Sequence, residues 1–180
     1  MNIIDILVTV DAQSIREKYR LNQDPTNPLP INPDPYIHML TNNQYVNTGQ
    51  GGYELNIFAK KGDEIRWHVV TISKDAQYTA NLEEFILSSS NPDDINKAKE
   101  YLSTPSPLLI ASYVPVLLSS NPVKMGTMKA PGYYWTTNVT KSPEPNTTYE
   151  IAYRFNAGIY FDDILQGYVT WDPFVTITNS

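Results

Sequence analysis

Aspartates are the residues of this chain whose type and spacing come closest to a chemical site. Asp162 and Asp163 are adjacent, and Asp24 and Asp34 lie in a loop rich in proline and asparagine. Calcium takes about six to eight oxygen ligands from carboxylates, amides and backbone carbonyls. We therefore take Asp24, Asp34, Asp162 and Asp163 as candidate metal ligands, and Ca²⁺ as the cofactor that they would hold.

A structural interpretation of the same residues stays open. Asp162 and Asp163 fall between two predicted strands, where a solvated turn is expected. Asp24 and Asp34 each precede a proline, which is ordinary turn chemistry. The sequence alone does not decide between a cation site and turns.

Patterns typical of an enzyme are missing from the sequence. It has two histidines in no metal-binding spacing, no cysteine and no GxSxG motif. A blue-copper site needs a thiolate, and a zinc hydrolase needs paired histidines, so we expect neither copper nor zinc. The protein is predicted not to be an enzyme, and no residue is assigned a catalytic role.

Aromatic residues give the second candidate site. Three tryptophans and thirteen tyrosines exceed what one small core needs, and an exposed ring offers a flat apolar surface to a sugar. The alternative is that these rings belong to the core. The candidate carbohydrate-binding residues near loop-like segments are Tyr36, Tyr53, Tyr133, Tyr134 and Trp135.

Length and charge narrow the class of protein. A chain of 180 residues is expected to form a single domain, residues 1–180. The net charge of -6 and the scattered basic residues argue against nucleic acid as a partner. No apolar stretch is long enough to span a membrane, and the N-terminus has no basic signal-peptide region. We expect a cytoplasmic protein, and any export would use a non-standard route.

The elements that must position these residues are mostly strands. Apolar residues alternate with polar ones over 55–59, 65–69 and 149–155, and 108–118 is an apolar run with a proline that indicates an edge strand. One short helix is expected from Pro92, which follows the cap residue Asn91. The predicted fold is all-β, an antiparallel β-sandwich. The GDEIRW segment and the aromatic strands after it are similar to cupredoxin-like sandwiches, without their copper.

The last strand contains an irregularity, in the segment GYVTWDPFVTI. We expect Trp171 to point into the core and anchor the strand. Asp172 and Pro173 are interpreted as a β-bulge that shifts the register of the residues after them, rather than as a working site.

Several segments together resemble the bacterial inclusion body protein family, the AidA/PixA family. They are IIDILVTVDAQSI, NPDPYIHMLT, TGQGGYELNIFAKKGDEIRW and GYVTWDPFVTI, in this order along nearly the whole chain. The resemblance implies a protein that accumulates in the cytoplasm, in some members as crystalline inclusions. It transfers no catalytic residue. It also implies sugar binding, which agrees with the aromatic and aspartate candidates. Some members are methionine-rich, whereas this chain has four methionines, so no role as a methionine store follows.

Two functions result from these observations. The first is a carbohydrate-binding protein, a lectin that is calcium-dependent and multivalent through oligomerisation. The alternative is a self-assembling cytoplasmic inclusion or storage protein without a small-molecule ligand. In both, the chain is expected to be its own partner in a dimer or larger assembly, because a sandwich has strand edges and aromatic surface to cover.

Overall fold

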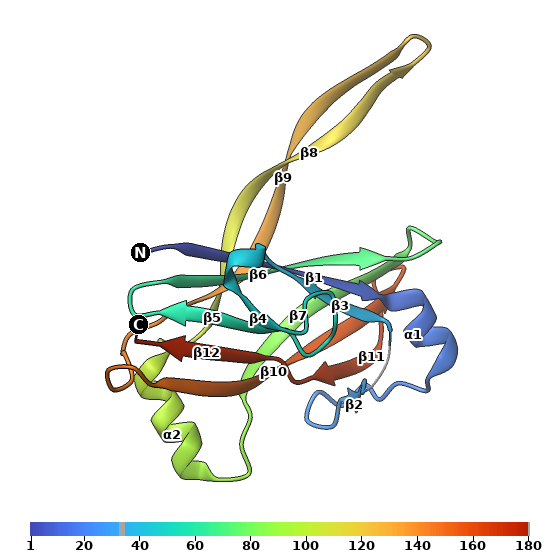
Figure 1. The fold of residues 1–180 in the computed structure, drawn as a ribbon. Coiled ribbons are helices and arrows are strands. Elements are labelled where there is room, and N and C mark those ends of the chain that lie inside the picture. The colour runs from blue at the N-terminus through green and yellow to red at the C-terminus, as the bar shows by residue number, and fades with distance from the viewer. Residues whose placement is uncertain (33–34, 180) are drawn as a thin grey trace.

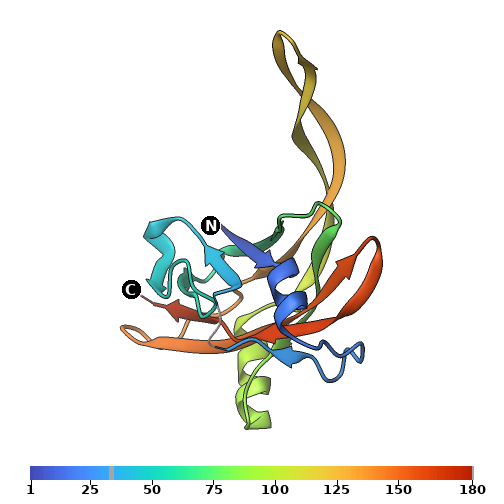
Figure 2. The ribbon, with the colours of Figure 1, turned by 90° about the vertical axis from the view of Figure 1, so that its right-hand side faces the viewer.

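Alternating apolar residues form the core side of the strands, as their period of two predicts. In the computed structural model, which describes residues 1–32 and 35–179, Ile65 and Trp67 are buried, while Arg66 between them and His68 after them reach the surface. Two sheets face each other across this core, and a long hairpin projects away from them (Figures 1 and 2). The all-β sandwich is confirmed.

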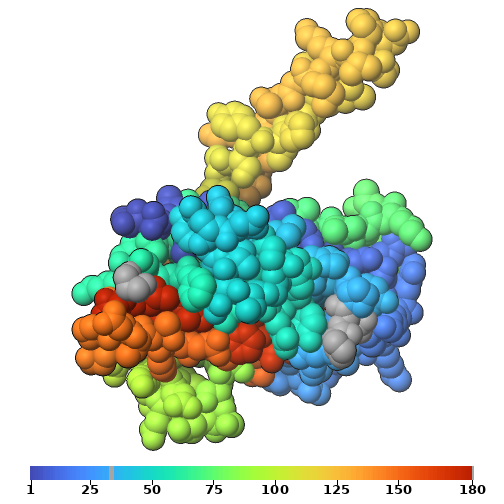
Figure 3. Space-filling view, viewed as in Figure 1, coloured from blue at the N-terminus to red at the C-terminus, as the bar shows by residue number. Residues whose placement is uncertain are grey.

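The first sheet has five strands and includes the projecting hairpin. Their spatial order is β3 (Ile37–Leu40), β1 (Ile3–Asp11), β6 (Glu64–Ile72), β9 (Val123–Asn138) and β8 (Ser106–Ser120). Strand β9 pairs with β6 only through its last residues, from Trp135 to Asn138, and pairs with β8 along its whole length. The distal part of β8 and β9 therefore leaves the body of the molecule as a two-stranded ribbon, which stands out as a narrow rod in Figure 3.

The second sheet has seven strands arranged around the long strand β10. They are β2 (Leu29–Pro30), β11 (Ile164–Trp171), β10 (Thr148–Phe161), β12 (Phe174–Thr178), β5 (Asn56–Lys60) and β4 (Val46–Thr48), with β7 (Tyr78–Leu87) also paired to β10. Strand β10 thus links most of this sheet.

Both sheets are mixed rather than purely antiparallel. Strand β1 runs parallel to β6, β12 parallel to β5, and β11 parallel to β2. Parallel neighbours need a long crossover connection. The two strands of each parallel pair are far apart in the sequence, so the chain between them is long enough for such a connection.

Two short helices flank the sheets where one was expected. Helix α2 (Pro92–Tyr101) has the predicted cap, because the Asn91 side chain accepts a hydrogen bond from the Asp93 amide at 3.0 Å. Helix α1 (Ala12–Lys18) follows β1, and Asp11 caps it through the Ser14 amide. A 3₁₀ turn, η1 (Asn43–Tyr45), completes the helical segments. No helix in the described part of the chain is long and apolar enough to cross a membrane.

An aromatic cluster fills the centre of the core. The Trp67 indole donates a hydrogen bond to the Tyr153 hydroxyl at 2.8 Å, and both side chains are fully buried. The rings of Phe85 and Phe155 contact both of them, at centroid distances between 4.9 and 5.9 Å. The cluster joins the two sheets, since Trp67 belongs to the first and the others to the second.

Trp171 anchors the last strand, as predicted. Its side chain is buried, its ring lies 6.3 Å from that of Phe155, and its indole donates to the Met39 sulfur at 3.3 Å.

The predicted β-bulge at Asp172 and Pro173 is wrong, because the register against β10 does not shift there. Phe155 lies opposite Trp171 and Ala152 lies opposite Phe174, so equal numbers of residues separate the pairs on both strands. Tyr153 still donates its amide to the Pro173 carbonyl at 3.0 Å. The strand on the side away from β10 does change at Pro173. Before it, β11 pairs with β2, and after it, β12 pairs with β5.

Replacing Trp171 with alanine should lower the free energy of unfolding by about 3–5 kcal/mol, because it leaves a cavity in the core. Ile164→Ala is the matched control, since Ile164 is 65% exposed, and should change stability by less than about 0.5 kcal/mol. Urea unfolding of both variants checks this. Equal midpoints for Trp171→Ala and the parent would contradict the anchor role.

Stability should fall as the pH rises above about 10, the ordinary pKa of tyrosine. Burial raises the pKa of Tyr153, so the unfolded chain releases this proton at a pH where the folded protein retains it. The loss contributed by Tyr153 is at most about 1.4 kcal/mol per pH unit. Tyr153→Phe should flatten the dependence of unfolding free energy on alkaline pH by up to that slope. Tyr113→Phe, at an exposed position, should leave the dependence unchanged.

Candidate functional site

The ribbon that leaves the body carries an unusual amount of exposed apolar surface. We call residues 108–134 the arm. Sixteen large apolar side chains are exposed among the described residues, and half of them lie on the arm. They are Leu108, Leu109, Tyr113, Leu117, Leu118, Val123, Met125 and Met128. Exposed apolar side chains gathered on one element in this way are typical of interaction sites.

One side of the arm continues the core side of the first sheet. Trp135 points into the core, where its ring lies 6.0 Å from Phe155. On the same side of the ribbon, further from the body, lie Leu109, Tyr113 and Leu117, which pair with Tyr133, Lys129 and Met125. Leu109 is 84% exposed and Tyr113 71%. These residues are placed like core residues, but the second sheet does not extend far enough to cover them.

The opposite side of the arm is partly covered by the arm itself. A Cβ at Gly126 would lie 2.8 Å from the Leu118 side chain, and one at Gly132 would lie 3.6 Å from Ile110. The glycines therefore let side chains of β8 lie across β9. The side that continues the core has no such arrangement and is the more open one.

Prolines protect the two edges of the arm. Pro107 and Pro115 lie on β8, and Pro131 lies on β9 opposite Ala111. The three cross-strand pairs that contain them are four residues apart along the ribbon, so their backbone groups have the same orientation. A proline has no amide hydrogen, so it fits where the backbone groups point away from the partner strand. Both outer edges thus lack some of the donors that an added strand would need, which disfavours pairing through the backbone.

A second exposed surface covers the first sheet on the side away from the core, which we call the outer face. Strands β1, β3 and β6 contribute exposed Ile3, Leu7, Leu40, Val70 and Ile72. The register places these residues side by side. Leu7 is paired with Leu40, and Leu7 is also opposite His68. The outer face is therefore a mixed surface with an apolar centre.

Polar groups on the outer face form a local network. Arg66 donates two hydrogen bonds to Glu64, at 2.8 and 2.9 Å, and these hold the pKa of Glu64 below its ordinary value. Thr136 also donates to Glu64 at 2.9 Å. The exposed Asp5 carboxylate lies 3.3 Å from the His68 ring nitrogen. Asp5 is also the cross-strand neighbour of Arg66, so two carboxylates, Glu64 and Asp5, share one guanidinium at the centre of this face.

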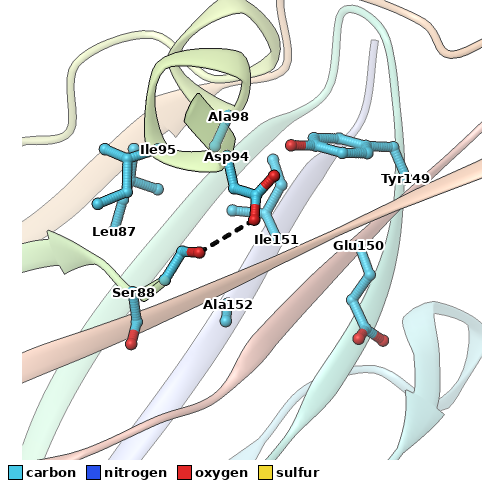
Figure 4. A pocket seen from close by; sticks show the side chains of 10 residues that line it. Leu87, Ser88, Asp94, Ile95, Ala98, Tyr149, Glu150, Ile151 and Ala152 are labelled. Atoms are coloured by element: carbon cyan, nitrogen blue, oxygen red, sulfur yellow. Dashed lines mark hydrogen bonds between the residues drawn. The ribbon is translucent and has the colours of Figure 1, made fainter. Parts of the chain in front are cut away.

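Helix α2 has one hollow on each side. The first, of about 340 Å³, is drawn in Figure 4, and the second, of about 620 Å³, faces β7. Leu87 and Ile95 line both. Asp94 accepts a hydrogen bond from Ser89 at 3.2 Å, and Glu150 points away from it, so the two carboxylates do not form an acid–base pair.

The predicted carbohydrate-binding residues do not form one platform. Trp135 is buried and its indole donates to the Leu82 carbonyl at 2.9 Å, while the Tyr133 hydroxyl accepts from the Leu82 amide at 2.8 Å. Tyr134 is buried on the other side of β9 beneath Arg66, which lies 4.8 Å from its ring centre. Tyr36 and Tyr53 are half-buried and lie in other segments.

Tyr36 lies beside one tyrosine and one lysine. Its ring meets Tyr19 edge-on at 6.5 Å, and the Lys18 ammonium lies 5.1 Å from both ring centres.

The predicted metal ligands occupy two turns. Asp162 and Asp163 have φ of 50° and 62° and form the tight turn between β10 and β11. The Asp24 carboxylate accepts from the amide and the hydroxyl of Thr26, at 2.9 and 2.7 Å, which lowers its pKa. Asp34 lies outside the described residues. Within 1–32 and 35–179, no three His, Asp or Glu side chains gather as a metal site would require.

The arm is what the sequence reasoning missed. Residues 108–118 were expected to form an edge strand, which is correct, but not one that leaves the body. A signal was present in the charges, because no carboxylate occurs between Glu100 and Glu144 and the arm carries only Lys124 and Lys129.

Comparisons with known proteins identify the family. The sequence model of the PixA family, described as inclusion body protein, matches residues 2–177. The crystal structure of the inclusion body protein (PixA) from Burkholderia cenocepacia J2315 has a TM-score of 0.71 at 14% identity, and the match covers 98% of this chain and 96% of that one. That similarity shows a shared fold.

Another solved structure, the laccase from Botrytis aclada, has a TM-score of 0.28 at 9% identity, with 99% of this chain and 29% of that chain covered. A similarity this low carries no argument. No curated protein matches. On the evidence of the family model, the chain belongs to the PixA inclusion body protein family.

Proposed function

We propose that this protein is a non-enzymatic, self-assembling member of its family, and that the arm is its assembly element. One observation carries the proposal: half of the exposed large apolar side chains of the described chain lie on the arm. Assembly of this kind would serve the formation of inclusions, which the family description, inclusion body protein, suggests.

Physical chemistry favours a partner for the arm. An isolated two-stranded hairpin is marginally stable in water, and a third strand or a packed layer is needed to hold it. Fully burying one large apolar side chain contributes about 1.5–3 kcal/mol. Covering Leu109, Tyr113 and Leu117 would therefore supply a substantial part of the free energy of a micromolar complex, about 8 kcal/mol.

This proposal reverses the order of the two functions inferred from sequence. Self-assembly gains support from the arm. Carbohydrate binding loses support, because Tyr133, Tyr134 and Trp135 have their rings or polar atoms engaged within the protein.

Removing the apolar side chains of the arm should weaken self-association. We expect Tyr113→Ser combined with Leu117→Ser to raise the dissociation constant by about a hundredfold, since two anchor residues of an interface are lost. Ile164→Ser is the matched control, because Ile164 is exposed outside the arm. Sedimentation velocity over a concentration series measures the constants.

As a control for folding, the unfolding midpoint of each variant is measured under monomeric conditions and should match that of the parent. Unchanged association of the double variant would contradict the proposal, as would a parent protein that stays monomeric at every concentration.

Carbohydrate binding stays a prediction with its own test. Tyr36 favours it, because its half-buried ring lies beside Tyr19 and Lys18 at a surface that follows the aspartate-containing loop. A glycan array run with millimolar calcium and again with a chelator measures it. If the lectin prediction holds, related glycans are bound, Tyr36→Ala reduces the signal, and loss on chelation indicates calcium. A blank array in both conditions would overturn it.

A further inference from the structure

We propose that the arm of a second copy of this chain lies across the outer face of the first sheet, over Ile3, Leu7, Leu40, Val70 and Ile72. This inference rests on the proposed function and names the surface that receives the arm. Contact between arms, or between the arm and the hollows beside α2, is the alternative.

The distribution of exposed apolar residues supports this pairing. Eight of the sixteen exposed large apolar side chains of the described residues lie on the arm, and five of the others lie on the outer face. The remaining three, Met1, Phe58 and Ile164, belong to neither surface. The molecule thus has two apolar surfaces of the kind that marks an interaction site, and each can cover the other.

Charge separates this pairing from contact between arms. The arm has Lys124 and Lys129 and no carboxylate, whereas the rest of the chain has 11 basic and 19 acidic residues. Two arms in contact would bring four ammonium groups together without a counter-charge, and juxtaposed like charges disfavour a complex. The outer face instead offers two carboxylates, Glu64 and the exposed Asp5, against the single guanidinium of Arg66.

The positions of the two surfaces make the contact reachable. Figure 1 shows that the arm rises from the same end of the molecule at which β1, β3 and β6 lie, whereas α2 lies at the opposite end. At the root of the arm, Leu108 is paired with Tyr134, which lies on the outer face beneath Arg66. The side of the arm that carries Leu108 is therefore continuous with the outer face, while Leu109, Tyr113 and Leu117 point to the other side of the ribbon. Two copies that meet at this end can each lay an arm on the other, as in a twofold symmetric interface.

The larger of the two hollows beside α2 fits the arm less well, whereas the smaller one is lined by two carboxylates, Asp94 and Glu150. The larger hollow is lined by one carboxylate and one ammonium group, Glu84 and Lys99. It therefore offers no excess of negative charge to the two lysines of the arm.

A mixing experiment tests the inference. The arm variant carries Tyr113→Ser and Leu117→Ser, and the face variant carries Val70→Lys and Ile72→Lys, which remove apolar surface and repel the lysines of the arm. Each variant alone should associate at least about tenfold more weakly than the parent. In an equimolar mixture the intact arm of the face variant can bind the intact outer face of the arm variant. We expect a 1:1 complex that neither variant forms alone, measured by sedimentation velocity with one variant fluorescently labelled.

Controls keep the outcomes distinct. Leu7→Lys with Leu40→Lys is a second face variant, for use if the first has a lowered unfolding midpoint. Phe58→Lys with Ile164→Lys adds the same charge at exposed apolar positions outside both surfaces and should leave association unchanged. If the parent associates but no mixed complex forms, or if the face variants associate like the parent, the inference is overturned and the proposed function stands. If the parent itself is monomeric, both fail.

Discussion

A β-sheet that extends beyond its opposing layer leaves one row of apolar side chains without cover, and this constraint shapes the molecule. At Trp135 the first sheet still faces Phe155 across the core. Beyond Tyr133 the second sheet has ended, yet the ribbon continues with Leu109, Tyr113 and Leu117 on the same side. The hydrophobic effect is non-directional and acts on any apolar area in contact with water. The chain's own sandwich therefore leaves these residues exposed to water.

The body of the sandwich was predictable because its signals are local. Alternation around the turn at Gly62 and Asp63 gave the strands, and the cap at Asn91 gave α2. The arm was not predictable in the same way. Alternation tells which side of a strand a residue is on, but it does not tell whether a second layer lies opposite. Leu109 and Ile65 look equivalent in the sequence, yet one is 84% exposed and the other fully buried.

Predicting the candidate sites also required knowing which residues lie near each other in space. Pro131 and Gly132 made the segment before Tyr133 look like a loop, and so suggested exposed rings. In the structure they are strand residues, because the proline occupies an outward-facing backbone position and the glycine accommodates Ile110. Asp162 and Asp163 follow the structural alternative at the backbone level, since both adopt the left-handed conformation of a tight turn. Whether they also bind a cation depends on neighbours that spacing along the chain does not supply.

The prolines along the arm have a consequence for how an assembled state could be undone. Backbone ladders between chains give amyloid its extreme kinetic persistence. Pro115 and Pro131 on the arm and Pro107 at its root interrupt the outer edges of the ribbon, so the proposed contacts between copies would rest mainly on side chains. An assembly of the proposed kind would therefore dissolve on dilution, as a protein crystal does, and would release folded chains.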